Sequence, residues 1–246
     1  MKEKRRNNGF SLTEVLIAVG ILSVGLLFMA GTFSAGIRFT TIAYERTVAS
    51  VAAKEAFGKV RLFGPLASLT PDQQTLLFDP NITDPNVINE FAYPSTKEDW
   101  RQKRYFWSAL GRRVQVDNSS AQVTVFVNRK VGAGTKYRNP VNPLDSAAAI
   151  AYPMPVRVDV FGVTGDYLLT IPDSNAANWV NDGYTIVDDE TGQIYRVLER
   201  YASDEQIVLL DRKWQGSSPG SVWVVPPPVG AGRYPCIAVY QKIIKF

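Results

Sequence analysis

The first forty residues read MKEKRRNNGF SLTEVLIAVG ILSVGLLFMA GTFSAGIRFT, and they carry most of the information about the architecture of the chain. Residues 2–6 contain four cations and one acid, whereas residues 15–37 run for 23 positions without a charge. An α-helix of that length spans about 34 Å, which is enough to cross the hydrocarbon core of a bilayer. The basic residues in front of it predict a cytoplasmic N-terminus by the positive-inside rule. We therefore expect residues 10–37 to form a single transmembrane helix.

The junction between Gly9 and Phe10 separates the basic leader from the apolar run. An ordinary secretory signal has a shorter apolar run and a small-residue cleavage site at its far end. Here the candidate processing site lies before the apolar run. Cleavage there removes residues 1–9 and keeps the hydrophobic helix as an anchor.

A single acid, Glu14, stands at the start of the apolar run. A carboxylate at bilayer depth costs roughly 2.5–3.5 kcal/mol on insertion scales, so it normally has a partner or a function. The alternative is an interfacial acid in the first helical turn, where the positive end of the helix dipole stabilises it. The Gly9-Phe10 junction four residues earlier favours the functional interpretation.

Residues 9–18, GFSLTEVLIA, resemble the class III signal of type IV pilins and type II secretion pseudopilins. The resemblance implies cleavage after Gly9 by a prepilin peptidase and N-methylation of Phe10. It also implies that the Glu14 carboxylate neutralises the terminal amine of a neighbouring subunit during filament assembly, since two charges that are costly in lipid become tolerable as a close pair. The sequence SLTEVLIAVGIL resembles minor pilins and pseudopilins more than major pilins.

The same resemblance implies the location and the partners of the chain. It implies a single-pass protein of the inner membrane, with a periplasmic or extracellular head, that enters a filament after processing. The implied partners are other pilin or pseudopilin subunits, the peptidase/N-methyltransferase, the inner-membrane assembly platform and membrane lipid. The residues expected to form the membrane anchor are Val15, Leu16, Ile17, Ile21, Leu22, Leu26, Leu27 and Phe28. Many pilins carry a proline midway along this helix, but none occurs between Phe10 and Gly64 here.

The helical pattern continues beyond the apolar run. Charges return in residues 38–63, while Ala49, Ala53, Ala56 and Val60 keep the spacing of one helix face. Gly64-Pro65 then provides a stop signal. We predict one helix within residues 10–64, half in lipid and half amphipathic. A plain membrane anchor with a stalk is the alternative.

Everything after the helix is expected to be an irregular loop followed by β-structure. Residues 65–100 are rich in Pro, Asp and Asn, and we interpret Asp72, Asp79 and Asp84 as turn residues rather than calcium ligands. The strands expected from alternation and turn spacing are 105–113, 121–128, 156–160, 167–171, 184–187, 194–198, 207–210, 222–225 and 237–244.

The predicted fold class is α+β, with a long N-terminal helix packed on an antiparallel sheet. Residues 65–155 are assigned to a pilin-like head, residues 156–228 to an inserted all-β barrel or sandwich, and residues 229–246 to a closing strand that returns to the sheet.

The composition argues against catalysis and against a bound cofactor or metal. There is no histidine, which removes the commonest general base and metal ligand. The single Cys236 is interpreted as a buried small hydrophobe, and phosphate-binding glycine motifs are missing. The acidic run at residues 188–190 is interpreted as a solvated turn, and the hairpin-like segment 162–166 as a turn.

Nucleic acid is a possible but disfavoured partner. The formal charge is +4, but without residues 1–9 it is only +1. Basic and aromatic residues interleave in residues 100–113, a pattern that suits stacking on bases. A β-strand with an aromatic buried face and a basic outer face would produce the same pattern, and we favour this interpretation. The preferred function is a minor pilin or pseudopilin, and the alternative is a DNA- or surface-binding pilin that uses its β-rich head for adhesion or competence.

Overall fold

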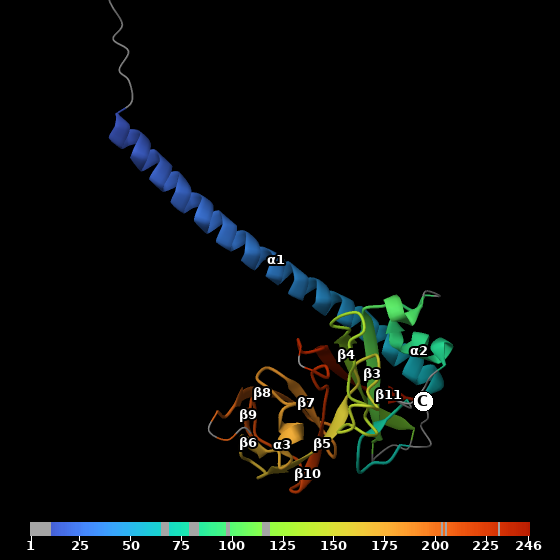
Figure 1. The fold of residues 1–246 in the computed structure, drawn as a ribbon. Coiled ribbons are helices and arrows are strands. Elements are labelled where there is room, and N and C mark those ends of the chain that lie inside the picture. The colour runs from blue at the N-terminus through green and yellow to red at the C-terminus, as the bar shows by residue number, and fades with distance from the viewer. Residues whose placement is uncertain are drawn as a thin grey trace, which may run out of the picture. The chain divides into compact units, whose positions relative to one another are not determined.

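A computed structural model describes residues 11–64, 69–78, 84–96, 99–114, 119–202, 204, 206–230 and 232–246. The chain divides into two compact units, Met1–Glu45 and Arg46–Phe246. The first unit contains the N-terminal part of helix α1 (Leu12–Phe63; Figure 1), which is 52 residues long. The helix ends at Phe63, directly before Gly64, so the predicted continuation and stop are confirmed.

In the second unit, the head contains an antiparallel sheet with the strand order β1-β3-β4-β11. These strands are β1 (Thr75–Leu76), β3 (Tyr105–Arg113), β4 (Ser120–Arg129) and β11 (Cys236–Lys245), and β2 (Ala92–Tyr93) also pairs with β3. The register sets Trp107 opposite Val127 and Val239 opposite Phe126. The predicted strands at 105–113, 121–128 and 237–244 are confirmed, and the last strand of the chain does return to this sheet.

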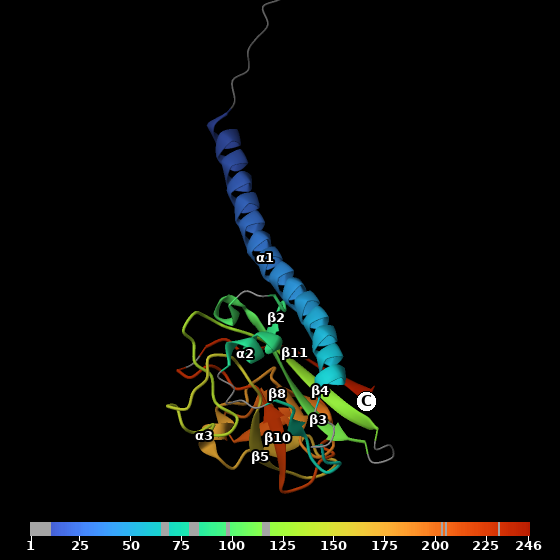
Figure 2. The same ribbon diagram turned by 90° about the vertical axis from the view of Figure 1, so that its right-hand side faces the viewer.

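The two central strands of the sheet, β3 and β4, are mostly buried on both faces. On one face, the C-terminal part of α1 lies beside the sheet (Figure 2). There, Ala49, Ala53, Ala56 and Val60 of α1 pack on side chains of the central strands, including Trp107. On the other face, a second apolar cluster joins the sheet to the barrel described below, and its buried members are Leu110, Phe126, Val187, Trp223, Val225 and Cys236. The expected basic outer face of residues 105–113 is therefore wrong, because most of β3 lies between two packed layers.

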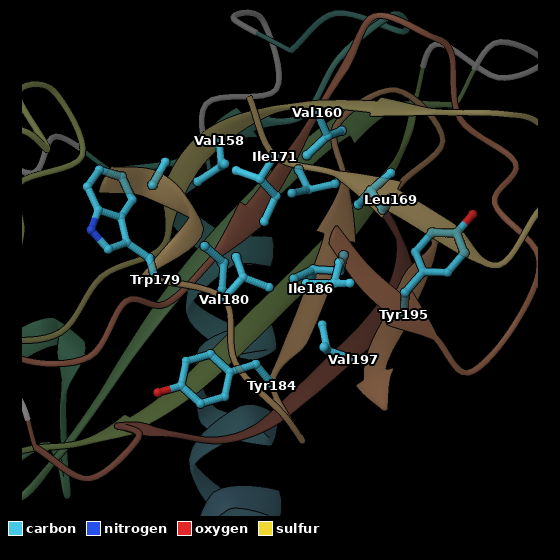
Figure 3. Packing of buried hydrophobic residues seen from close by; sticks show 14 of the residues in the cluster. Val158, Val160, Leu169, Ile171, Trp179, Val180, Tyr184, Ile186, Tyr195 and Val197 are labelled. Carbon is cyan, nitrogen blue, oxygen red and sulfur yellow. The ribbon is translucent and has the colours of Figure 1, made fainter. Parts of the chain in front are cut away.

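Six short strands close into a barrel with the order β10-β5-β6-β9-β8-β7. They are β5 (Val156–Gly162), β6 (Leu168–Thr170), β7 (Thr185–Asp188), β8 (Ile194–Arg200), β9 (Ile207–Leu210) and β10 (Gly220–Val224). A short helix, α3 (Ser174–Ala177), lies between β6 and β7. In β5, alternate residues are buried, as the sequence predicted from period-two alternation. Figure 3 shows side chains of this core, including Val158, Leu169 and Ile186.

The described parts of residues 65–100 contain regular elements where the sequence predicted an irregular loop. They contain a seven-residue helix, α2 (Pro85–Phe91), and η2 (Trp100–Gln102) begins at their end. Both have an aspartate N-cap: the Asp84 side chain accepts a hydrogen bond from the Asn86 N–H, and Asp99 accepts one from the Arg101 N–H. Asp84 followed by Pro85 is a helix start signal, because proline at the first helical position has no N–H to leave unpaired.

The observed architecture confirms the α+β class, with a long N-terminal helix and antiparallel sheets. The sheet and the barrel belong to the same compact unit. The segment boundaries at residues 155 and 228 remain predictions.

Candidate processing and assembly site

The N-terminal end of α1 holds the one acidic residue of its first turn, Glu14. The helix begins at Leu12, and the Ser11 carbonyl accepts a hydrogen bond from the Val15 N–H at 3.2 Å. A carboxylate in the first turn interacts favourably with the positive end of the helix dipole. The Glu14 side chain is exposed in the single chain. The predicted processing residues Gly9 and Phe10 lie outside the described residues.

An apolar surface surrounds the helix directly after Glu14. Residues 15–37 carry no charge, and none of the apolar stretch of α1 is buried. The anchor residues predicted from the sequence have exposed fractions between 50 and 74%. A helix that is apolar on all sides requires burial in a membrane or in a larger protein assembly. This part of α1 is therefore long and apolar enough to serve as a membrane anchor.

The hydroxyl groups along this apolar helix are satisfied within the helix itself. Ser23 Oγ donates to the Val19 carbonyl at 2.8 Å, and Thr40 and Thr41 donate to the carbonyls four residues earlier at 2.9 Å each. Ser34 makes the same bond to Ala30, and Thr32 bonds to Met29. Because a polar group without a partner is costly in hydrocarbon, these bonds make the segment compatible with an apolar environment.

Comparison with known families finds one match in the same region. The profile of the prokaryotic N-terminal methylation motif matches residues 4–30. Together with the long apolar helix, this match identifies a prepilin signal of the type IV pilin-like kind. The match supports a precursor of the type IV pilin or pseudopilin type. A motif of this kind implies processing by a prepilin peptidase and assembly with other pilins. Searches of curated proteins and of solved structures return no match.

The acidic turn between β7 and β8 differs from its prediction as a solvated turn. Asp188 and Asp189 are only 1% and 5% exposed. The Thr191 N–H donates to Asp188 Oδ2 at 2.8 Å, and Trp223 Nε1 donates to Asp189 Oδ1 at 2.6 Å. The Arg157 guanidinium forms an ion pair with Asp189 at 2.9 Å. Desolvation by burial raises the pKa of both carboxyl groups above their ordinary value.

The same turn connects the barrel to the sheet through backbone carbonyls. The Gln74 N–H donates to the Asp189 carbonyl at 2.7 Å, and Gln241 Nε2 donates to the Gly192 carbonyl at 2.6 Å. Arg112 donates to the Glu190 carbonyl. The turn therefore has a structural role that the sequence analysis missed. No local signal marks it, because its partners come from three distant segments.

The remaining candidates from the sequence also have structural roles. Trp100 is 8% exposed, with the Arg101 guanidinium 5.3 Å from its ring centre and Lys130 Nζ at 5.8 Å. A buried ring offers no free face on which a base could stack, so the interleaved residues 100–113 form no stacking surface. Cys236 is buried, as predicted, and burial raises its thiol pKa to about 12.

The sequence also predicted turns at residues 162–166 and at the aspartates of residues 65–100. The segment 162–166 connects β5 to β6 as a turn, with Gly165 at φ +91°. Asp84 caps α2, Asp72 lines a surface cleft beside the barrel, and Asp79 lies outside the described residues. Within the described ranges, no three His, Cys, Asp or Glu side chains gather in a way that could hold a metal ion.

Proposed function

We propose that the protein is a minor pilin of a type IV pilus or a pseudopilin of a type II secretion system. The observation that carries this proposal is the exposed apolar part of α1, headed by Glu14 and overlapping the methylation motif. A surface of this kind is stable only when lipid or other subunits cover it. In this proposal it lies in the inner membrane before assembly and in the filament core afterwards.

The proposed maturation begins with cleavage between Gly9 and Phe10 by the prepilin peptidase, followed by methylation of the new amine. The Phe10 amine of one subunit then lies next to the Glu14 carboxylate of a neighbour. Each charge alone is costly in an apolar environment, and pairing offsets much of that cost. The pair thus gives a reason for an acid at the start of a membrane segment.

The proposed location is the inner membrane, with one span, a cytoplasmic N-terminus before cleavage and the head on the opposite side. The inner-membrane assembly platform is the proposed partner for extraction from lipid. We further propose that the chain performs no catalysis of its own. The histidine-free composition supports this proposal, because histidine is the side chain best suited to acid–base chemistry near neutral pH.

A DNA- or surface-binding pilin remains the second candidate from the sequence. Its best candidate surface for nucleic acid was the basic and aromatic stretch at residues 100–113, and burial of Trp100 and Phe106 removes the aromatic part of that surface. The structural subunit is therefore the function that the observations support best.

The test is to express the chain with and without a prepilin peptidase and to measure its intact mass in the membrane fraction. Processing at Gly9-Phe10 gives a 237-residue product with Phe10 at its N-terminus, and a methylated amine adds about 14 Da to it. The control without peptidase keeps the full 246 residues. A chain that still begins at Met1 in the presence of an active peptidase contradicts the proposal.

A further inference from the structure

The last strand of the chain, β11, forms an open edge of the sheet. It is ten residues long and pairs only with β4, and no other described strand pairs with it. This is about twice the average strand length of 5–6 residues. An unpaired edge of this length is a template for another extended chain, unless something covers it.

The register of β11 tells which backbone groups face the open edge. The Phe246 N–H donates to the Ser119 carbonyl at 2.9 Å, and Lys245 lies opposite Ser120. In an antiparallel pair, alternate residues bond to the partner strand, and the residues between them point their N–H and C=O groups away. Val239, Gln241, Ile243 and Lys245 are the residues with outward-pointing backbone groups.

A groove runs between this edge and α1. Its walls are the helix stripe Lys54, Phe57, Gly58 and Arg61 and the end of β11, residues 242–245. Its volume is about 530 Å³. An alanine-type Cβ added to Gly58 would meet nothing within 4 Å, so the helix leaves open space at the middle of the groove.

The charges around the groove are all positive. Lys54, Arg61, Lys242 and Lys245 line it, and no carboxylate does. In the described part of the chain, none of these four side chains makes a hydrogen bond or an ion pair. Phe57 and Ile244 contribute an apolar floor. The side chain of Ile243, the residue before Ile244 in β11, points to the other face of the sheet and is 63% exposed. Four neighbouring cations without counter-charges favour an anionic partner.

We propose that this groove binds an extended acidic segment of a partner protein, which adds to the sheet as a strand beside β11. The outward N–H and C=O groups would bond to the partner's backbone, while the four cations select its acidic side chains. A peptide backbone supplies donors and acceptors in alternation. The phosphates of nucleic acids and lipid head groups only accept, so they would leave the outward carbonyls of β11 without donors.

Edge lysines in many proteins act as protection against unwanted pairing, and Lys242 and Lys245 fit that role by themselves. Lys54 and Arg61 do not, because they project from the helix on the other wall of the groove. Protection of the edge does not explain why both walls carry unpaired cations. The proposal stands without any assumption about processing at Gly9.

The experiment measures binding of a labelled, blocked heptapeptide of alternating glutamate and valine to the full chain in zwitterionic detergent. The matched probes are the same peptide with N-methyl groups on alternate amides, which keeps the charge but prevents strand pairing, and a lysine–valine peptide. We expect the N-methylated and the lysine peptides to bind at least tenfold more weakly than the parent. We also expect the parent to slow hydrogen exchange at the outward amides of Gln241, Ile243 and Lys245.

The variant Lys54→Gln/Arg61→Gln should weaken binding of the parent peptide at least tenfold. Lys213→Gln, at an exposed lysine outside the groove, is the matched control and should leave binding unchanged. Circular dichroism of both variants confirms that the head is folded. Three results would overturn the proposal: equal binding of the parent and N-methylated peptides, no effect of the groove variant, or tighter binding, in competition, of a single-stranded oligonucleotide or of phosphatidylglycerol in mixed micelles with the same detergent.

Discussion

At position 14, a carboxylate occupies the first turn of a helix whose following surface is apolar on every side. If it pairs with the Phe10 amine of a neighbour, Glu14→Ala should leave membrane insertion and cleavage intact, since the leader and the apolar run are unchanged. It should reduce entry into the filament, because an unpaired buried charge costs about 3–5 kcal/mol. The measurement is the fraction of each variant in sheared filaments, normalised to its processed pool in the membrane.

Glu14→Gln is the control for shape and hydrogen bonding, since it removes only the charge. Equal loss of incorporation in both variants identifies the charge as the cause. A purely interfacial acid stabilised by the helix dipole predicts a loss of at most about 1 kcal/mol and near-normal assembly. Wild-type incorporation of both variants would remove Glu14 from the assembly mechanism.

Also at the scale of single residues, burial at the β7–β8 turn raises the pKa of Asp188 and Asp189 above the ordinary value of 3.8. A carboxyl group with a raised pKa in the folded state binds protons more tightly there than in the unfolded state. Its contribution to stability is therefore fully present below the unfolded pKa and is lost as the pH rises through the folded pKa. Each unit of difference between the two pKa values corresponds to about 1.4 kcal/mol.

The prediction concerns Asp188→Asn, which removes one of these titrations. The free energy of unfolding of the wild type minus that of the variant should increase as the pH falls from 7 to 4. Urea unfolding of the full chain in detergent, followed by tryptophan fluorescence, measures this difference. An exposed control, Asp166→Asn, removes a carboxylate that lies outside the buried turn. If this difference in the free energy of unfolding decreased as the pH falls, the predicted direction of the pH dependence would be wrong.

At the scale of elements, the β7–β8 turn depends on Gly192, which has φ +70°. A Cβ at this position would lie 2.5 Å from Gln74 Nε2 and 3.0 Å from Gln122 Oε1. Gln74 is buried, so it has little room to move aside. Gly192→Ala should therefore lower the free energy of unfolding by about 1–3 kcal/mol through overpacking, in addition to the cost of the left-handed backbone.

Gly134→Ala is the matched control, because Gly134 has φ +73° and nothing within 4 Å of its would-be Cβ. This variant measures the cost of placing alanine in a left-handed backbone conformation without the overpacking that is expected at position 192. Denaturant unfolding of both variants should show a larger loss for Gly192→Ala. Equal losses would mean that the contacts of the turn with Gln74 and Gln122 do not hold the barrel against the sheet.

At the scale of the whole molecule, the sheet and the barrel share a buried apolar cluster that includes Leu110, Phe126 and Trp223. Residues Arg46–Phe246 form one compact unit that contains the amphipathic end of α1 but not the exposed apolar part. We expect a chain limited to this unit to be soluble without detergent, monomeric and mainly β by circular dichroism, with a single thermal transition.

The comparison for this prediction is the full chain, which should require detergent because its apolar helix remains exposed. Two separate transitions in the shortened chain would show that the barrel unfolds independently of the sheet. A spectrum dominated by helix would contradict the strand assignments themselves.

Local patterns were sufficient for the class of protein, the helix and most strands. Glu14, the apolar run and the stop at Gly64 are contiguous signals, and the period-two alternation at Val156, Val158 and Val160 specifies which side of a strand is buried. Each depends only on residues close in sequence, so each can be read without a fold. The missed helix α2 belongs here too, since Asp84 followed by Pro85 is a local start signal.

Local sequence patterns could not predict which residues are buried by segments far away in the chain. Asp188 and Asp189 lie in a turn that would be solvated in isolation, and they are buried because segments from Gln74 to Gln241 meet there. Both faces of β3 are covered because α1 and the barrel pack on opposite sides of one sheet. The groove beside β11 joins cations that are almost 200 positions apart in the chain. Such neighbours are determined only when the layers pack, because burial depends on contacts that the local pattern of a segment does not encode.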